Sequence, residues 1–172
     1  MNIRRATPAD AALLCELAER TFVETFGHLY PPEDLADYLA GAYPVAQQAQ
    51  QLASDDYAAW LLEVDGHAAG FAFAGPCGLP HADVQAGDGE LKRLYVLREY
   101  QNGGRGGQLF DAALQWLQAR WKGALWIGVW SENFGAQRFY ARHGFQQVGT
   151  YEFPVGRVRD KELILRRSAH AR

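Results

Sequence analysis

Residues 89–120 combine a strand pattern, a glycine run and an amphipathic helix pattern in direct succession, and this unit limits the possible folds most. Four glycines stand among the five residues 103–107. A flexible linker would have polar, weakly structured neighbours, and a tight turn would need only one or two glycines. The pattern therefore predicts a strand–loop–helix unit whose backbone N–H groups bind a phosphate at the helix N-terminus. The apolar residues at helical spacing are Leu109, Phe110, Ala113, Leu114, Trp116 and Leu117.

Antiparallel strands are expected on both sides of this unit. Residues 57–75 read as two apolar strands joined at Asp65-Gly66, a strong hairpin signal. The segments "FQQVGTYEF" and "VRDKELILRR" predict a second antiparallel pair near the end of the chain. A short strand opens the chain, and "ALWIGVW" reads as a buried strand. The sheet must then be mixed, because a strand–helix–strand crossover lies between two hairpins.

Helix patterns fill the remaining segments. One helix starts near Pro8 and Asp10 and ends before Gly27, and two short helices in residues 31–53 are divided around Gly41 and Pro44. Another is expected in "NFGAQRFYARHG", with Asn133 as N-cap and Gly144 at its end. We therefore expect a mixed α/β fold: one domain over residues 1–172, with a central sheet of six or seven strands flanked by about four helices.

Composition is that of a globular chain. The apolar fraction is 48% and the aromatic fraction 13%, and the net charge of −3 argues against nucleic-acid binding. Cys15 falls in a helical apolar pattern and Cys77 in a Gly/Pro loop, with no metal-like spacing. Isolated thiols and the absence of a leader or a membrane-length apolar run predict a soluble, cytoplasmic protein.

Two familiar phosphate loops fail on specific residues. A dinucleotide fingerprint would continue from Gly104 and Gly106 to a third glycine, where this chain has Leu109. A triphosphate loop would need Lys-Ser/Thr after its last glycine, where this chain has Gln108 and Leu109. Neither of these two motifs therefore identifies the ligand whose phosphate the loop would bind.

Two spaced motifs resemble those of the GCN5-related N-acetyltransferase (GNAT) family. The first is V-x(4)-[QR]-x-x-G-x-[GA], and the second is N-x-x-A-x-x-F-Y-x-x-x-G-F, beginning at Asn133. The resemblance is strong over residues 89–149 and implies acetyl-CoA binding, with no metal. It assigns the binding to Leu94, Tyr95, Val96, Gln101, Asn102, Gly103, Gly104, Arg105, Gly106, Gly107, Asn133, Ala136 and Phe139. Phe139 also reads as core, and Arg105 either contacts a phosphate or points to solvent.

The resemblance also implies catalytic roles. Tyr140 occupies the family's general-acid position, and a phenol is protonated at neutral pH. Backbone N–H groups of about Leu94–Val96 would stabilise the oxyanion, near a bulge of the central strand. Glu90 could deprotonate or attract the amine, or be a solvated carboxylate. Alternation places it on one face with Lys92, Leu94 and Val96. Lys92, where polyamine-type relatives often carry an acid, weakens a polycation interpretation.

The front of the chain resembles bacterial spermidine/spermine-type acetyltransferases. That likeness implies an acceptor pocket lined by Phe22, Thr25, Phe26, His28, Tyr30 and Trp130, with Glu132 at its border. Taken alone, His28 is a surface residue, and Trp60, Trp116, Trp121 and Trp126 read as packing residues.

The sequence thus predicts acetyl transfer from acetyl-CoA to a primary amine of a small molecule, directly in a ternary complex. Neither cysteine lies in a motif, so no covalent acyl-enzyme is expected. The alternatives are an acyl-CoA sensor without catalysis, an acetyltransferase acting on peptide N-termini, and a nucleotide-dependent oxidoreductase. Polyamine, other amine and amino acid acceptors stay open, as do a monomer and a homodimer; no membrane partner is expected.

Overall fold

The computed structural model describes residues 1–169 and contains one seven-stranded sheet in the order β1-β2-β3-β4-β5-β7-β6. All neighbouring strands are antiparallel except β4 and β5, which are parallel. The mixed sheet is therefore confirmed, with seven strands and five α-helices. The strands are β1 (Asn2–Arg5), β2 (Ala58–Val64), β3 (His67–Pro76), β4 (Gly89–Val96), β5 (Leu125–Trp130), β6 (Gln146–Val155) and β7 (Val158–Arg167). The helices are α1 (Ala11–Phe26), α2 (Pro32–Ala42), α3 (Val45–Ala53), α4 (Arg105–Arg120) and α5 (Phe134–Arg142).

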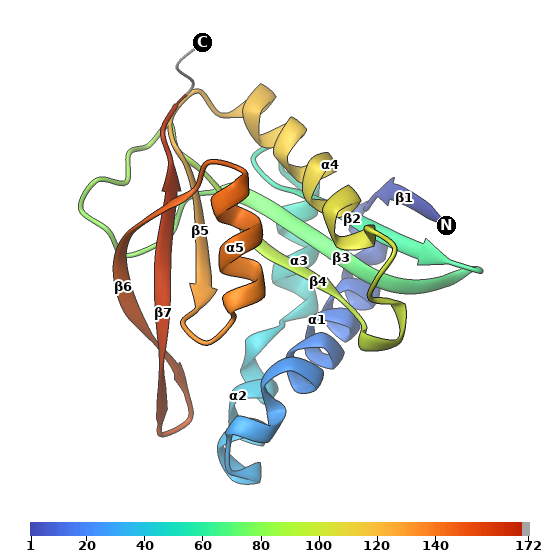
Figure 1. Cartoon of the computed structure of the whole chain (residues 1–172). Coiled ribbons are helices and arrows are strands. Elements are labelled where there is room, and N and C mark those ends of the chain that lie inside the picture. The colour runs from blue at the N-terminus through green and yellow to red at the C-terminus, as the bar shows by residue number, and fades with distance from the viewer. Residues whose placement is uncertain (170–172) are drawn as a thin grey trace.

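The helices cover the sheet from both faces (Figure 1). Alternation along β2 sends Trp60 and Leu62 into a core shared with α4, and Ala59 and Leu61 into a core shared with α1. The α4 and α5 face carries the larger core, which includes the fully buried Phe110. A β-strand buried on both faces reads as a continuous apolar run, as β2 does.

Local turn chemistry agrees with the expected boundaries. Asp65 and Gly66 both have positive φ, 50° and 79°, as a two-residue type I′ hairpin turn requires. The side chain of Asn133 accepts a hydrogen bond from the N–H of Ala136 and caps α5, and Gly144 follows that helix with φ 86°. These three turn predictions are confirmed.

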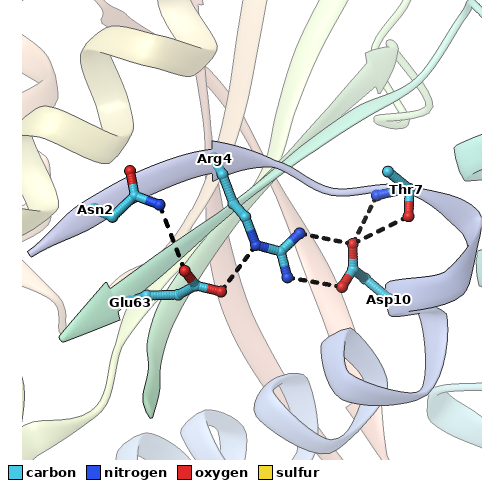
Figure 2. Close-up of polar contacts among 5 residues, drawn as sticks. All are labelled: Asn2, Arg4, Thr7, Asp10 and Glu63. Carbon is cyan, nitrogen blue, oxygen red and sulfur yellow. Dashed lines mark hydrogen bonds and ion pairs between the residues drawn. The ribbon is translucent and has the colours of Figure 1, made fainter. Parts of the chain in front are cut away.

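A polar network fixes the first strand to its neighbours (Figure 2). The Arg4 guanidinium donates two hydrogen bonds of 2.9 Å to the Asp10 carboxylate and one of 2.8 Å to Glu63 on β2. The N–H of Thr7 also donates to Asp10, and Asn2 donates to Glu63. The start of the chain, the turn before α1 and strand β2 are held together in this way.

The sheet opens between its two parallel strands. Pairing of β4 with β5 runs only from Gly89↔Leu125 to Leu91↔Ile127, although both strands continue beyond these residues. On its other side β4 stays paired with β3 as far as Val96. The carboxyl halves of β4 and β5 therefore diverge, and this divergence positions the candidate site.

A β-bulge in β4 corrects the expected alternation. Leu91 pairs with Ala74 and Arg93 with Phe73, so one extra residue, Lys92, is inserted in β4. The insertion changes the parity of the strand, and Leu91, Leu94 and Val96 all pack toward the α4 face. The expectation that Glu90 shares a face with Leu94 and Val96 is therefore wrong. The bulge at Lys92 lies two residues before Leu94, so the N–H groups of Leu94–Val96 follow it closely.

Candidate active site

A cavity of about 540 Å³ occupies the divergence between β4 and β5. Because it passes through the sheet, it is lined from both faces: by motif residues at one end and by aromatic residues of α1, α2 and β6 at the other. Thirteen predicted site residues line it. They are Phe22, Thr25, Phe26, Tyr30, Glu90, Leu94, Tyr95, Val96, Gln101, Trp130, Asn133, Ala136 and Tyr140.

Backbone N–H groups of β4 point into this opening. The N–H of Leu97 donates to the Ala69 carbonyl of β3. Because donors alternate along an antiparallel strand, the N–H groups of Leu94 and Val96 point the other way, toward β5. The sheet has no β5 partner for them at this level, since the pairing of residues 89–91 is the only β4–β5 pairing within residues 1–169. Two donors are thus available to a ligand oxygen.

The glycine run forms the turn into α4. Asn102, Gly103 and Gly104 have φ of 91°, 65° and 74°, in the left-handed region that favours glycine. Gln101 fixes the turn by donating from Nε2 to the Val96 carbonyl at 3.0 Å. Helix geometry leaves the N–H groups of the first turn, Arg105 to Gly107, without intrahelical acceptors. The turn is exposed and lies beside the cavity rather than among its lining residues.

The space outside this turn is open. A Cβ atom built on Gly106 or Gly107 would have no neighbouring heavy atom within 4 Å. Positive helix-end potential and free N–H groups at an open surface are what an anionic group requires. The first turn of α4 therefore fits a phosphate.

The Arg105 side chain makes a contact within the protein. It is the first residue of α4, not the middle of a loop, and its Nη1 donates to the Tyr100 carbonyl at 2.9 Å. The side chain is half-buried and closes the turn against the residues before it. The contact uses one of the five guanidinium N–H donors, and phosphate binding by Arg105 stays a prediction.

Tyr140 lies on α5 with its ring in the core and its side chain at the cavity. The residue is 7% exposed and packs near Phe110 and Phe145. Burial, and then the nearby Tyr95, raise the pKa of the Tyr140 hydroxyl above its ordinary value. The hydroxyl is therefore protonated at neutral pH, as a proton donor must be.

Glu90 is a buried carboxylate whose Oε2 atom already has two donors. The Lys92 ammonium lies 3.0 Å from this atom, and the N–H of Gly78 donates to it at 2.9 Å. Both Glu90 and Lys92 line the cavity. Lys92, which the sequence suggested as an obstacle to a polycation, is thus partly neutralised by its neighbour.

The far end of the cavity is aromatic. Phe26 packs edge-on against Trp130 with ring centroids 5.5 Å apart, and Phe22 lies 4.7 Å from Tyr38. The sequence pointed to Phe22, Phe26, Tyr30 and Trp130 but missed Tyr38, Tyr43, Tyr151 and Phe153, which also line the cavity. The aromatic content of "DYLAGAY" and "GTYEF" was the available signal.

Glu162 is the most consequential residue that sequence reasoning missed. It lies on β7, opposite Trp130 on β5 and Tyr151 on β6, and it lines the cavity. Burial, with a smaller contribution from Asp160, raises the pKa of its carboxyl to about 7. Two acids at alternate positions of a final strand, Asp160 and Glu162, were the signal in the sequence.

Some predicted residues lie outside the cavity lining. His28 is exposed in a short turn after α1, and Glu132 is exposed before α5. Phe139 packs against Phe110 and His143 in the core. The glycine-turn residues Asn102, Gly103, Gly104, Arg105, Gly106 and Gly107 lie beside the cavity, as described above.

Among residues 1–169 there is no cluster of three or more His, Cys, Asp or Glu side chains arranged to hold a metal ion. No helix in this part of the chain is both long and apolar enough to cross a membrane. Cys15 is buried and Cys77 half-buried, and both are free thiols.

A sheet that opens between two parallel strands, a glycine turn leading into a helix beside the opening, and a buried tyrosine within it define the class of acyl-CoA N-acyltransferases. The particular family follows from the sequence. The chain belongs to the acetyltransferase (GNAT) family, whose sequence profile matches residues 13–145. It is an acetyl-CoA-dependent N-acetyltransferase of that family.

Relatives of known sequence and a solved structure agree with this family assignment. An uncharacterized N-acetyltransferase of Lactobacillus delbrueckii subsp. lactis is 27% identical over 98% of this chain and 97% of its own length. The spermine/spermidine N(1)-acetyltransferase of Bacillus subtilis is 31% identical over 59% of this chain and 68% of its own length. The crystal structure of PaiA N-acetyltransferase from Thermoplasma acidophilum, a complex with coenzyme A, superposes with TM-score 0.74 at 19% identity, covering 97% of this chain and 98% of that one.

Proposed function

We propose that this chain transfers the acetyl group of acetyl-CoA to a primary amine of a small molecule, directly, in a ternary complex. The observation that carries the proposal is that one cavity has two kinds of lining. The β4 residues with free N–H groups and Tyr140 lie at one end, and aromatic residues with Glu162 lie at the other. Donor and acceptor can meet there because the cavity passes through the opened sheet. One volume of about 540 Å³ suits a small amine beside a thioester.

The donor half of the site fits coenzyme A. The pyrophosphate would lie against the N–H groups of Arg105 to Gly107, where a helix N-terminus and open space coincide. Acetyl-CoA supplies an activated thioester carbonyl. The N–H groups of Leu94 and Val96 would donate hydrogen bonds to the carbonyl oxygen as it becomes an oxyanion.

Tyr140 would act as the general acid. Its hydroxyl stays protonated well above neutral pH and lines the same cavity as the N–H groups of β4. A thiolate leaving group requires a proton, and a positioned phenol can donate it. The two free cysteines support direct transfer in this scheme, since neither Cys15 nor Cys77 lines the cavity.

The acceptor half favours a small cationic amine. Aromatic faces attract cations, and Glu162 adds negative charge among them. The Bacillus subtilis relative acts on spermine and spermidine, and by that likeness a polyamine is one acceptor to include. Lys92 is paired with Glu90, so its charge is no strong barrier to a second ammonium.

The proposal is tested by release of free coenzyme A thiol from acetyl-CoA with a panel of amines. The panel holds spermidine, cadaverine, a simple monoamine, a free amino acid and a peptide with a free N-terminus. We expect turnover with small amines and little with the peptide. Preference for the peptide would contradict the small-molecule acceptor. Coenzyme A binding without turnover on any amine would favour a sensor.

A further inference from the structure

We propose that Glu162 accepts the proton that the acceptor ammonium must lose, and that the tyrosines around it hold the ammonium in place. This inference rests on the proposed function and adds a catalytic residue to it.

Glu162 stands on β7 between Trp130 on β5 and Tyr151 on β6, in register with both. Its side chain is half-buried and lines the same cavity as Tyr140. A group on a central, fully paired part of the sheet is held more rigidly than one on a loop, which suits a proton acceptor that must meet a bound amine.

Phenols from several elements line the same cavity as this carboxylate, and Tyr151 lies in register with it. Burial is the largest cause of the raised pKa of Tyr30 after α1, Tyr38 on α2, Tyr95 on β4 and Tyr151 on β6, and the charge of Glu162 adds a smaller contribution to each. Electron-rich rings grouped around a carboxylate are a common way to hold an alkylammonium ion. The arrangement therefore provides both a counter-charge and a cage for one cationic nitrogen.

Charged groups near Glu162 leave its carboxylate available. No Lys or Arg within residues 1–169 forms a salt bridge with it. The charge of Arg93 partly offsets the raised pKa of Tyr38 and Tyr95, and its guanidinium stacks over the rings of Tyr43 and Phe73. Glu162 interacts electrostatically with Tyr30, Tyr38, Tyr95, Tyr151 and Asp160. Arg93 interacts in the same way with Tyr38 and Tyr95, and Glu90 with Tyr151.

The other two carboxylates already have donors. Glu90 receives the Lys92 ammonium and the Gly78 N–H, and Asp160 receives the Tyr30 hydroxyl. Of the three acids, Glu162 is the one that the structure leaves open to an incoming ammonium. Its pKa of about 7, set by burial and by Asp160, makes it a suitable base at neutral pH.

The protons balance in the resulting scheme. The ammonium gives one proton to Glu162, which releases it to solvent. The neutral nitrogen attacks the thioester carbon, so that a C–N bond forms and the C–S bond breaks. Tyr140 gives its proton to the thiolate sulfur. The nitrogen loses its second proton as the amide forms, and this proton restores Tyr140.

The test compares the pH dependence of kcat/KM for the wild-type enzyme, Glu162→Gln and Glu162→Asp with the best amine of the panel. Wild-type kcat/KM should rise up to about pH 7 and then level off until the amine itself deprotonates. Glu162→Gln should lower kcat/KM about 100-fold at pH 7 and remove the limb near 7, so that the rate keeps rising toward the pKa of the amine. Glu162→Asp should restore the limb and part of the rate.

Two controls separate folding from chemistry. Glu152→Gln changes an exposed acid of β6 outside the cavity lining and should leave the profile unchanged. Calorimetry should show that Glu162→Gln binds coenzyme A as the wild-type enzyme does. A Glu162→Gln profile that keeps the limb near pH 7 at wild-type rate would overturn the proposal, whereas a wild-type chain that acetylates no amine would overturn the proposed function with it.

Discussion

The Tyr30 hydroxyl donates a hydrogen bond to the carboxylate of Asp160, a residue 130 positions further along the chain. This contact joins the end of the α1 segment to strand β7 at the rim of the cavity. A second link lies nearby, where the buried carboxylate of Asp34 on α2 accepts hydrogen bonds from the backbone and guanidinium of Arg157. The aromatic end of the cavity, which Tyr30 lines, is thus flanked by contacts between segments that are distant in the sequence.

Tyr30→Phe should loosen this closure. The substitution removes the donor and leaves the part-buried Asp160 unsatisfied beside Glu162, which costs about 1 kcal/mol of unfolding free energy. We expect KM for the amine to rise about tenfold with a smaller change in kcat. Steady-state kinetics and denaturant unfolding measure the two effects. Tyr57→Phe, a ring-stacked tyrosine outside the cavity lining, is the matched control; equal effects of both variants would contradict a specific role.

Tyr140→Phe should separate proton donation from packing. The ring stays in the core beside Phe110, while the hydroxyl at the cavity is lost. We expect kcat to fall about 100-fold with coenzyme A affinity nearly unchanged, because loss of a general acid acts on the chemical step. Single-turnover kinetics and calorimetry check this. An unchanged acetylation rate would remove Tyr140 as the acid.

The two ends of the glycine turn should respond differently to alanine. Gly106 lies within α4 and its Cβ would meet no atom within 4 Å, so Gly106→Ala should leave stability equal or raise it by about 1 kcal/mol. If a phosphate approaches this backbone closely, the added methyl group should still weaken acetyl-CoA binding about tenfold. Calorimetry and thermal unfolding together decide, and wild-type affinity would place the phosphate elsewhere.

Gly104→Ala provides the contrasting case. Gly104 has φ 74°, a conformation that costs a residue with a Cβ about 1–2 kcal/mol. This variant should therefore lose both stability and acetyl-CoA affinity. A stable Gly104→Ala protein would mean that the turn tolerates a different backbone path.

The Arg4 network should make stability depend on pH in the acidic range. Hydrogen bonds from Arg4 lower the pKa of Asp10 from 3.8 to about 2. A carboxylate with a lowered folded-state pKa makes its full contribution to the free energy of unfolding above pH 4. It loses that contribution as the pH falls toward 2. Asp10→Asn should cost about 1 kcal/mol at pH 7, since the pair is partly exposed, and progressively less below pH 4. Denaturant unfolding at several pH values measures this, with Asp111→Asn, an exposed acid of α4, as the control.

Local patterns predicted most of the fold because each depends on few residues. The Asp65-Gly66 turn, the Asn133 cap and the amphipathic repeat of α4 are properties of short segments, and all three were found as expected. The motifs beginning at Val96 and Asn133 likewise placed Gln101 and Tyr140 at one cavity. The local sequence of each segment was enough to predict these features.

What could not be predicted depends on single-residue register and on distant contacts. The bulge at Lys92 moved Glu90 to the other face from Leu94, and alternation alone could not show an extra residue. Glu162 reached the cavity because β7 lies between β5 and β6, an order that sequence neighbours do not reveal. Arg105 was assigned to a loop because the helix start depends on the left-handed Gly104.

The bulge in β4 also makes the length of that strand as important as its composition. Residues before Lys92 and residues after it occupy opposite phases of the pleat, so the strand directs Leu91 and Leu94 into the same core while their separation is odd. Deleting one residue here would exchange the two faces for the rest of the strand, turning Tyr95 toward the larger core and Val96 toward the α1 face. A substitution in β4 changes one side chain, but a deletion would reverse the direction of every later side chain of the strand on both faces of the sheet.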